Sequence, residues 1–146
     1  MEQLVTISPV TNKPVLFRNA LPPAEIALLP RQAERAFEFY RRTPLKHRQE
    51  IVAKALDILD GQQERLANEL TEQIGRPIKF ARKEIATAVV RGKYLLKISE
   101  ESLRDTPGEK EEGFKRYIRK VPVGPVLILF AWNVSANALK ISTNDC

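Results

Sequence analysis

The stretch from Val126 to Phe130 constrains the fold more than any other part of the chain, because it is apolar at every position. Gly124 and Pro125 precede it and mark the turn from which it starts. A strand that is apolar on both faces is typical of a parallel sheet covered by helices on both sides. Residues 134–146 are mixed in character and supply no second strand of this kind. We therefore expect residues 126–130 to open a larger, covered sheet.

Three long helices are predicted before this strand, near residues 24–42, 45–74 and 77–102. Apolar residues recur in each at spacings of three and four, which places them on one face of a helix. The Thr-Pro pair at 43–44 separates the first two helices, because the residue before a proline is pushed out of the helical region. Gly61 marks a bend in the second helix. The apolar face of the first helix consists of Ala33, Ala36, Phe37 and Tyr40.

Short strands are predicted on both sides of this helical region, residues 22–104. Residues 4–18 contain two extended pieces around a turn-rich centre, which indicates a β-hairpin. An acidic loop with turn residues follows the helices at 105–113, and the segments 114–121 and 123–130 are predicted strands. The expected fold class is therefore α+β.

Composition excludes several classes of protein. The 24 Lys and Arg against 18 Asp and Glu give a net charge of +6, but the charges are mixed along the chain, as on solvated helix faces. The chain has one cysteine, Cys146, and one histidine, His47, so an internal disulfide, a His-dependent triad and a zinc site are not expected. It shows no secretory pattern and no window of about 18 apolar residues. We expect a cytoplasmic protein without a membrane span or a metal site.

The residues that most often carry chemistry occur here without a catalytic pattern. The six glycines form neither a G-x-G-x-x-G motif nor a P-loop, and no G-x-S-x-G is present. Neighbouring acids such as Glu69 with Glu72, and Glu100 with Glu101, lie on charged helical surfaces, and Glu84 is assigned to the same solvated class. His47 is expected to be an exposed helix residue, and Cys146 is not expected to be a nucleophile.

The segment Phe114–Lys120 is the best candidate for binding an anionic polymer. It interleaves aromatic residues with four basic residues, a composition that single-strand nucleic-acid platforms use for stacking and phosphate contact. The alternative is a sheet edge on which positive charge discourages stray strand pairing. We favour the guarded edge, because the aromatic residues alternate imperfectly and no second platform strand is present.

Four stretches of the sequence resemble the NAD(P)-dependent aldehyde dehydrogenases. The resemblance runs from the N-terminal hairpin through Asn133, and its most specific part combines a Pro-Val-Gly turn, the apolar strand and a terminal Trp-Asn pair. The helical patterns alone are less specific. The matching stretches are AERAFEFYRRTPL at 33–45, RQEIVAKALDIL at 48–59, LANELTEQIGRPI at 66–78 and RKVPVGPVLILFAWN at 119–133.

This resemblance implies particular roles for the last of these stretches. The segment 114–121 corresponds to an oligomerisation element, and residues 126–130 resemble the first strand of a Rossmann-like domain that binds NAD or NADP. Phe130, Ala131 and Trp132 correspond to positions that line the cofactor site. Asn133 matches the asparagine whose side-chain amide donates to the oxyanion of the thiohemiacetal.

The resemblance to the family ends after Asn133, where the family has an aromatic residue, a proline and a long apolar helix. Residues 134–146 are therefore expected to be a tail unrelated to the family, following the N-terminal part of an aldehyde dehydrogenase domain at 1–133. The catalytic cysteine and glutamate of the family have no counterpart here. We expect a truncated chain that neither oxidises aldehydes nor binds the cofactor by itself. Two alternatives are an interaction protein that pairs with full-length subunits or with its own copies through residues 114–121, and a nucleic-acid module on the same segment.

Overall fold

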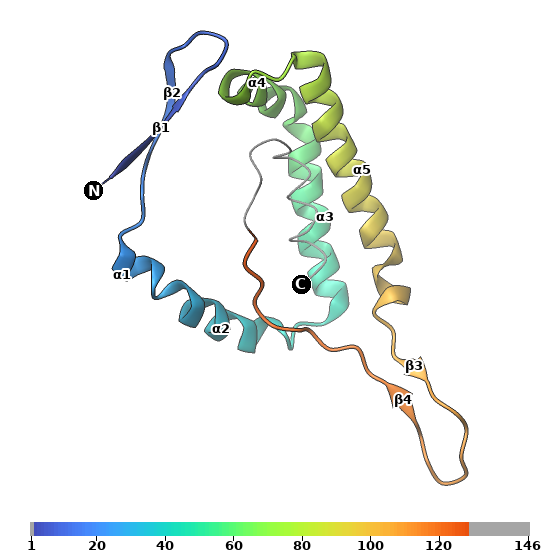
Figure 1. Ribbon diagram of the computed structural model, residues 1–146. Helices are drawn as coiled ribbons and strands as arrows, with labels where there is room; N and C mark the ends of the chain where they lie inside the picture. The colour runs from blue at the N-terminus through green and yellow to red at the C-terminus, as the bar shows by residue number, and fades with distance from the viewer. Residues whose placement is uncertain (1, 129–146) are drawn as a thin grey trace.

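The computed structural model describes residues 2–128, and these form two small β-hairpins and five helices (Figure 1). The α+β class expected from the sequence is confirmed. In chain order the elements are β1 (Gln3–Ile7), β2 (Pro14–Asn19), α1 (Pro23–Ile26), α2 (Leu29–Tyr40), α3 (Leu45–Gly61), α4 (Gln63–Ile74), α5 (Ile78–Ser102), β3 (Thr106–Pro107) and β4 (Tyr117–Ile118). None of the helices in this part of the chain is long and apolar enough to cross a membrane.

The predicted N-terminal hairpin is confirmed, and its turn rests on the end of α4. β1 and β2 pair antiparallel, with Val5 opposite Phe17. The Ser8 hydroxyl is fully buried and accepts hydrogen bonds from two amides of the turn. Gly75 ends α4 in the left-handed conformation with φ 71°, and a Cβ there would lie 2.8 Å from the Pro9 ring. Glycine is therefore required both for the helix end and for the contact with the hairpin.

Two of the three predicted helices are each divided in two. The helix expected at 24–42 consists of α1 and α2, which are separated at Ala27 and Leu28, with Pro30 in the first turn of α2. The helix expected at 45–74 breaks at Gln62, one residue after the predicted bend at Gly61. The third helix matches α5 closely. The spacing of apolar residues therefore located the helices. It did not define where each helix is interrupted, because the apolar pattern continues through the interruptions.

The described part of the chain buries its core between α3, α4 and α5, which we call the helical layer. Figure 1 shows α5 lying along α3, with α4 across their upper ends. The core residues are mostly small, and Gly92 of α5 is buried against the side chain of Leu56. Small residues at these positions let the helix backbones approach closely. The buried apolar residues are Leu56, Ala67, Ala81, Ile85, Ala88 and Val89.

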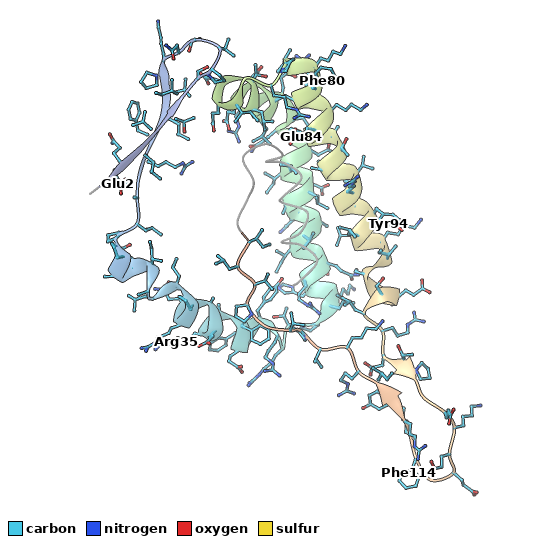
Figure 2. The ribbon with its side chains drawn as sticks, viewed as in Figure 1. Glu2, Arg35, Phe80, Glu84, Tyr94 and Phe114 are labelled. Atoms are coloured by element: carbon cyan, nitrogen blue, oxygen red, sulfur yellow. The ribbon has the colours of Figure 1, made fainter. Side chains whose placement is uncertain are left out.

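Glu84 is buried in the helical layer, so the prediction that it is a solvated surface acid is wrong. Its side chain is 2% exposed, and one carboxylate oxygen lies 3.0 Å from Nε of Arg76. Figure 2 marks the position of Glu84. Glu84 precedes the buried Ile85 on the face of α5 that meets its neighbours, and the loop after α4 brings Arg76 to it. A buried carboxylate requires such a partner. Sequence periodicity alone treated Glu84 as one more surface acid.

Exposed ion pairs hold the outer edges of the same helices. Arg82 on α5 donates hydrogen bonds of 2.8 Å and 2.6 Å to the two oxygens of Glu64 on α4. These hydrogen bonds hold the pKa of Glu64 below its usual value of 4.5. Lys93 similarly donates to Asp60 at 3.1 Å and lowers the pKa of that carboxyl. Lowered acid pKa values mean that these pairs stabilise the fold at neutral pH and stop doing so as the pH falls through the lowered values.

An Arg82→Gln substitution should raise the pKa of Glu64 towards its usual value of 4.5, because the substitution removes the charged donor. The side-chain carboxyl carbon of Glu64, followed by NMR across an acid titration, measures this directly. Arg65→Gln is the matched control, since Arg65 pairs instead with Glu69. An unchanged titration midpoint for Glu64 in the Arg82 variant would contradict the assignment.

The predicted strand at 114–121 is much shorter than expected. Only Tyr117 and Ile118 form β4, and they pair with Ile118 opposite Thr106 and Tyr117 opposite Pro107. Both partners lie at or within the loop expected at 105–113. Pro107 has no amide hydrogen, which limits the ladder at this point. The resulting β3–β4 hairpin projects away from the helical layer (Figure 1).

The predicted strand at 123–130 has no counterpart in its described part. Residues 121–128 form no strand, and the exposed fractions of Val126 and Leu127 are 49% and 84%. A strand requires neighbouring backbone to accept and donate its hydrogen bonds, and no segment within residues 2–128 supplies a ladder here. Leu129 and Phe130 lie outside the described residues.

Candidate functional site

An apolar groove lies between α2 and the segment that precedes the residues expected to form the functional site. We call it the α2 groove, and its volume is about 310 Å³. One wall is the apolar face of α2 predicted from the sequence, and the other is the segment that ends at Ile128, two positions before Phe130. The groove therefore lies beside the segment that precedes the residues of the expected cofactor site. Its lining consists of Ala33, Ala36, Phe37, Tyr40, Arg41, Arg48, Pro122, Gly124, Pro125, Val126 and Ile128.

Arg48 is the polar residue of most interest in this groove, and the sequence reasoning did not single it out. It also lines a second apolar groove, of about 230 Å³, between α3 and α5. Its Nε is buried without a hydrogen-bond partner in the described part of the chain. A signal for Arg48 was present, because it lies on the same face of α3 as Val52 and Leu59. A basic residue on an apolar face indicates a structural or functional reason for its position.

The expected site residues themselves lie outside the described part of the chain. These are Phe130, Ala131 and Trp132 for the cofactor and Asn133 for the oxyanion. Cys146 also lies outside it. The geometry in hand therefore concerns what positions the chain before this site, and the roles of the four residues stay predictions.

The remaining candidates form no catalytic constellation within residues 2–128. His47 is on the first turn of α3, its side chain is 62% exposed, and its Nδ1 lies 3.6 Å from Glu50. The acids Glu69, Glu72, Glu100 and Glu101 lie on helices, and Glu69 pairs with Arg65 of its own helix. Those residues hold no cysteine and no group of His, Asp and Glu able to bind a metal ion. The described part of the chain thus has neither a thiol nucleophile nor a metal centre.

The aromatic rings of the basic segment are already occupied by its own arginines. The guanidinium carbon of Arg116 lies 5.9 Å from the centre of the Phe114 ring, and that of Arg119 lies 5.0 Å from the Tyr117 ring. Arg116 also pairs with Glu111, and Lys120 donates to the carbonyl of Ser102. Base stacking on the same ring faces would have to displace these contacts. The choice between a guarded edge and a nucleic-acid platform stays a prediction.

The described residues define a class of chain. It has an α+β fold, a helical layer and an apolar groove beside the segment that precedes the expected site. Residues 2–128 themselves hold no catalytic constellation. The sequence model of the aldehyde dehydrogenase family matches residues 1–143. The chain therefore belongs to the aldehyde dehydrogenase family, whose enzymes are oxidoreductases that use NAD or NADP. The match continues past Asn133, the point at which the resemblance found in the sequence ends.

Curated relatives and solved structures agree with this assignment. The chain is 27% identical over 133 residues to the succinate-semialdehyde dehydrogenase [NADP(+)] of Mycobacterium avium (strain 104), covering 89% of this chain and 28% of that protein. Its fold is similar to HpcC from Thermus thermophilus, with a TM-score of 0.85, 21% identity, and 98% and 28% of the two chains covered. It is also similar to the NADP-dependent glyceraldehyde-3-phosphate dehydrogenase from Bacillus halodurans C-125 complexed with NADP, with a TM-score of 0.84, 17% identity, and 99% and 32% covered. The chain thus spans less than a third of the length of these proteins.

Proposed function

We propose that this chain is the N-terminal portion of an NAD(P)-dependent aldehyde dehydrogenase and does not oxidise aldehydes by itself. The observation that carries the proposal is the family match over residues 1–143 of a chain that spans only 28% of the Mycobacterium avium relative. The exposed side chains of the described residues support it. Large apolar side chains are exposed there, among them Phe39 at 81%, Val123 at 87% and Leu127 at 84%, and these are suited to burial against further structure.

The described residues offer no place for a dinucleotide. Dinucleotide sites of the general Rossmann kind use a glycine-rich turn between a strand and a helix, and no helix within residues 2–128 begins in that way. We propose that contact with NAD or NADP depends on Phe130, Ala131 and Trp132 together with the length that the relatives have and this chain does not. By this reasoning the chain alone does not bind the cofactor.

In the proposed complete enzyme, Asn133 is an electrostatic catalyst. Its side-chain amide would donate a hydrogen bond to the oxygen that gains negative charge when a thiolate adds to the aldehyde. A donor of this type contributes about 3–4 kcal/mol to the transition state. The α2 groove would contribute by holding the chain directly before Asn133, so that the amide is aimed before the reaction begins.

The absence of activity is tested by mixing the purified chain with NAD or NADP and succinate semialdehyde, the aldehyde in the relatives' names. We expect formation of the reduced cofactor to stay at the rate of a buffer control. An absorbance increase proportional to protein concentration, and lost in an Asn133→Ala variant, would overturn the proposal. The Asn133→Asp variant is a second check, because a carboxylate would oppose the developing oxyanion and should abolish any such signal.

A second candidate function is pairing with full-length subunits, or with copies of the chain, through residues 114–121. The β3–β4 hairpin favours it, because within the described residues β4 pairs on one edge only, with β3. Ile118 is 68% exposed on this strand. An unpaired edge with an exposed apolar side chain is suited to accepting a strand from another chain.

Affinity capture with a tagged full-length relative tests this second function. We expect the wild-type chain to be retained and an Ile118→Asp variant to be retained about tenfold less, because a carboxylate would be buried at the new strand pair. Lys110→Gln, in the loop of the same hairpin, also lowers the net charge by one and is the control for charge. Equal retention of the wild type and the Ile118 variant would argue against the edge as the contact.

A further inference from the structure

The outer face of α5 carries a regular seam of residues that points away from the helical layer. Its members are spaced by four, three, four, three and four positions, the pattern of a helix face that meets another helix. Val90 and Tyr94 at its centre are 67% and 59% exposed. Figure 2 shows Tyr94 on the side of α5 opposite to the one that contacts α3. The outer seam consists of Lys83, Thr87, Val90, Tyr94, Lys97 and Glu101.

Charges on this seam have no partners within the described part of the chain, unlike those beside it. Arg82 and Lys93 flank the seam on α5, and both pair with acids of α3 or α4. Lys83, Lys97 and Glu101 form no ion pair with any residue in 2–128. The helical layer therefore satisfies the charges that face it and leaves the seam charges for another surface.

The positions of the seam are spaced symmetrically about residue 92, although Gly92 itself faces α3, so a second copy of the helix can be aligned with the seam in antiparallel orientation. A second α5 in antiparallel orientation, centred on the same position, places Lys83 opposite Glu101 and Val90 opposite Tyr94, each twice. Thr87 lies opposite Lys97, and its hydroxyl is already bonded to the carbonyl of Lys83 at 2.7 Å. A parallel pair would instead oppose each lysine to its own copy. We propose that α5 packs against α5 of a second copy of this chain, antiparallel, about a two-fold axis that passes between Val90 and Tyr94.

The contact is expected to be weak and dependent on concentration. From position 83 to 101 the seam is about 27 Å long at 1.5 Å per residue. One pair of helices of this length buries less than the roughly 1,200 Å² of a standard stable interface. Arg91 lies beside the centre of the proposed helix pair in both copies, so its positive charge lowers the affinity of the contact. Its long side chain can reach solvent, so it does not block the contact. A symmetric contact closes on itself, so association stops at the dimer.

Charge reversal on the full chain, followed by sedimentation equilibrium over a series of concentrations, tests the contact. We expect the wild type to dimerise. Lys83→Glu and Glu101→Lys should each raise the dissociation constant about tenfold, because each converts two attractive pairs into repulsive ones. The double variant restores attraction with the signs exchanged and should return to the wild-type value. Circular dichroism of each variant checks that the helices are intact, as expected for exposed positions.

General electrostatic repulsion between copies would give a different pattern of results. Glu101→Lys raises the charge from 24 − 18 = +6 to 25 − 17 = +8, and Lys83→Glu lowers it to 23 − 19 = +4. General repulsion would weaken association in the first variant and strengthen it in the second. Glu100→Lys is the matched control, because it makes the same charge change one position outside the seam and should leave the constant unchanged.

Four outcomes would overturn the proposal. The first three are a wild-type chain that stays monomeric at every concentration, a double variant that fails to recover, and a Glu100 variant as impaired as the Glu101 variant. Dimerisation lost in Ile118→Asp but unaffected by the seam variants would also overturn it, since it would place the contact on the β3–β4 hairpin.

Discussion

An Arg76→Met variant is expected to destabilise the helical layer by about 3–5 kcal/mol, because it leaves the carboxylate of Glu84 buried without its guanidinium partner. The asymmetry between the partners makes the effect large. The Glu84 side chain is 2% exposed, whereas that of Arg76 is 37% exposed. The arginine can be solvated after its partner is removed, but the glutamate cannot. Hydrogen exchange of the buried amides of α5 measures the change as a fall in protection of about a hundredfold or more.

The control for this variant is the same substitution at an exposed pair. Arg65→Met removes the partner of Glu69, and both side chains of that pair are substantially exposed, at 59% and 43%. Exposed pairs of this kind contribute about 0–1 kcal/mol, so protection should fall by no more than about fivefold. Similar losses in the two variants would show that burial of Glu84 does not govern the energetics.

Gly92→Val is expected to be the second most damaging change. A Cβ at position 92 would lie 2.4 Å from Cδ2 and 3.1 Å from Cδ1 of Leu56, which is itself 7% exposed and has little room to move. Overpacking of this kind costs about 1–3 kcal/mol. Valine adds two methyl groups beyond the Cβ, so the effect should lie near the upper limit and exceed any gain of up to about 1 kcal/mol from replacing glycine in a helix.

Two further variants test this explanation of Gly92. Leu56→Ala combined with Gly92→Val should cost less than the sum of the two single changes, because the truncation removes the side chain that valine meets. Gly61→Ala is the control, since nothing lies within 4 Å of a Cβ at Gly61. That change should stabilise α3 by roughly 0.4–1 kcal/mol. Hydrogen exchange of α3 and α5 reports all three, and a neutral Gly92→Val would refute the close contact.

Periodicity in the sequence was sufficient to find the N-terminal hairpin, the helices and the α+β class. These features depend on local spacing, which is written along the chain. The apolar face of α2 was also predicted, and it forms a wall of the α2 groove. The bend predicted at Gly61 lies one residue before the break at Gln62. The break at Ala27 and Leu28 was not located, because an apolar stripe can run through a short interruption without changing its period.

The important residues of the candidate site could not be predicted from the spacing of apolar residues. Arg48 and Glu84 are ordinary charged residues in the sequence, and the position of each is defined by residues distant in the chain. Arg48 becomes notable because α2 and the segment before Ile128 close over it. Glu84 becomes notable because the loop after α4 brings Arg76 beside it. The partners of a buried charge cannot be read from helical periodicity, which reports only the face on which a residue lies.

The sequence by itself determined the N-terminal hairpin, the helical region, the α+β class and membership of the aldehyde dehydrogenase family, because periodicity and short motifs are local properties. The tertiary structure decided which charges are buried, how short the strand at Tyr117 and Ile118 is, and that residues 121–128 pair with no described strand. These features depend on contacts between distant segments. A strand forms only where neighbouring backbone satisfies its amides and carbonyls, and an apolar pattern, however clear, does not supply that neighbour.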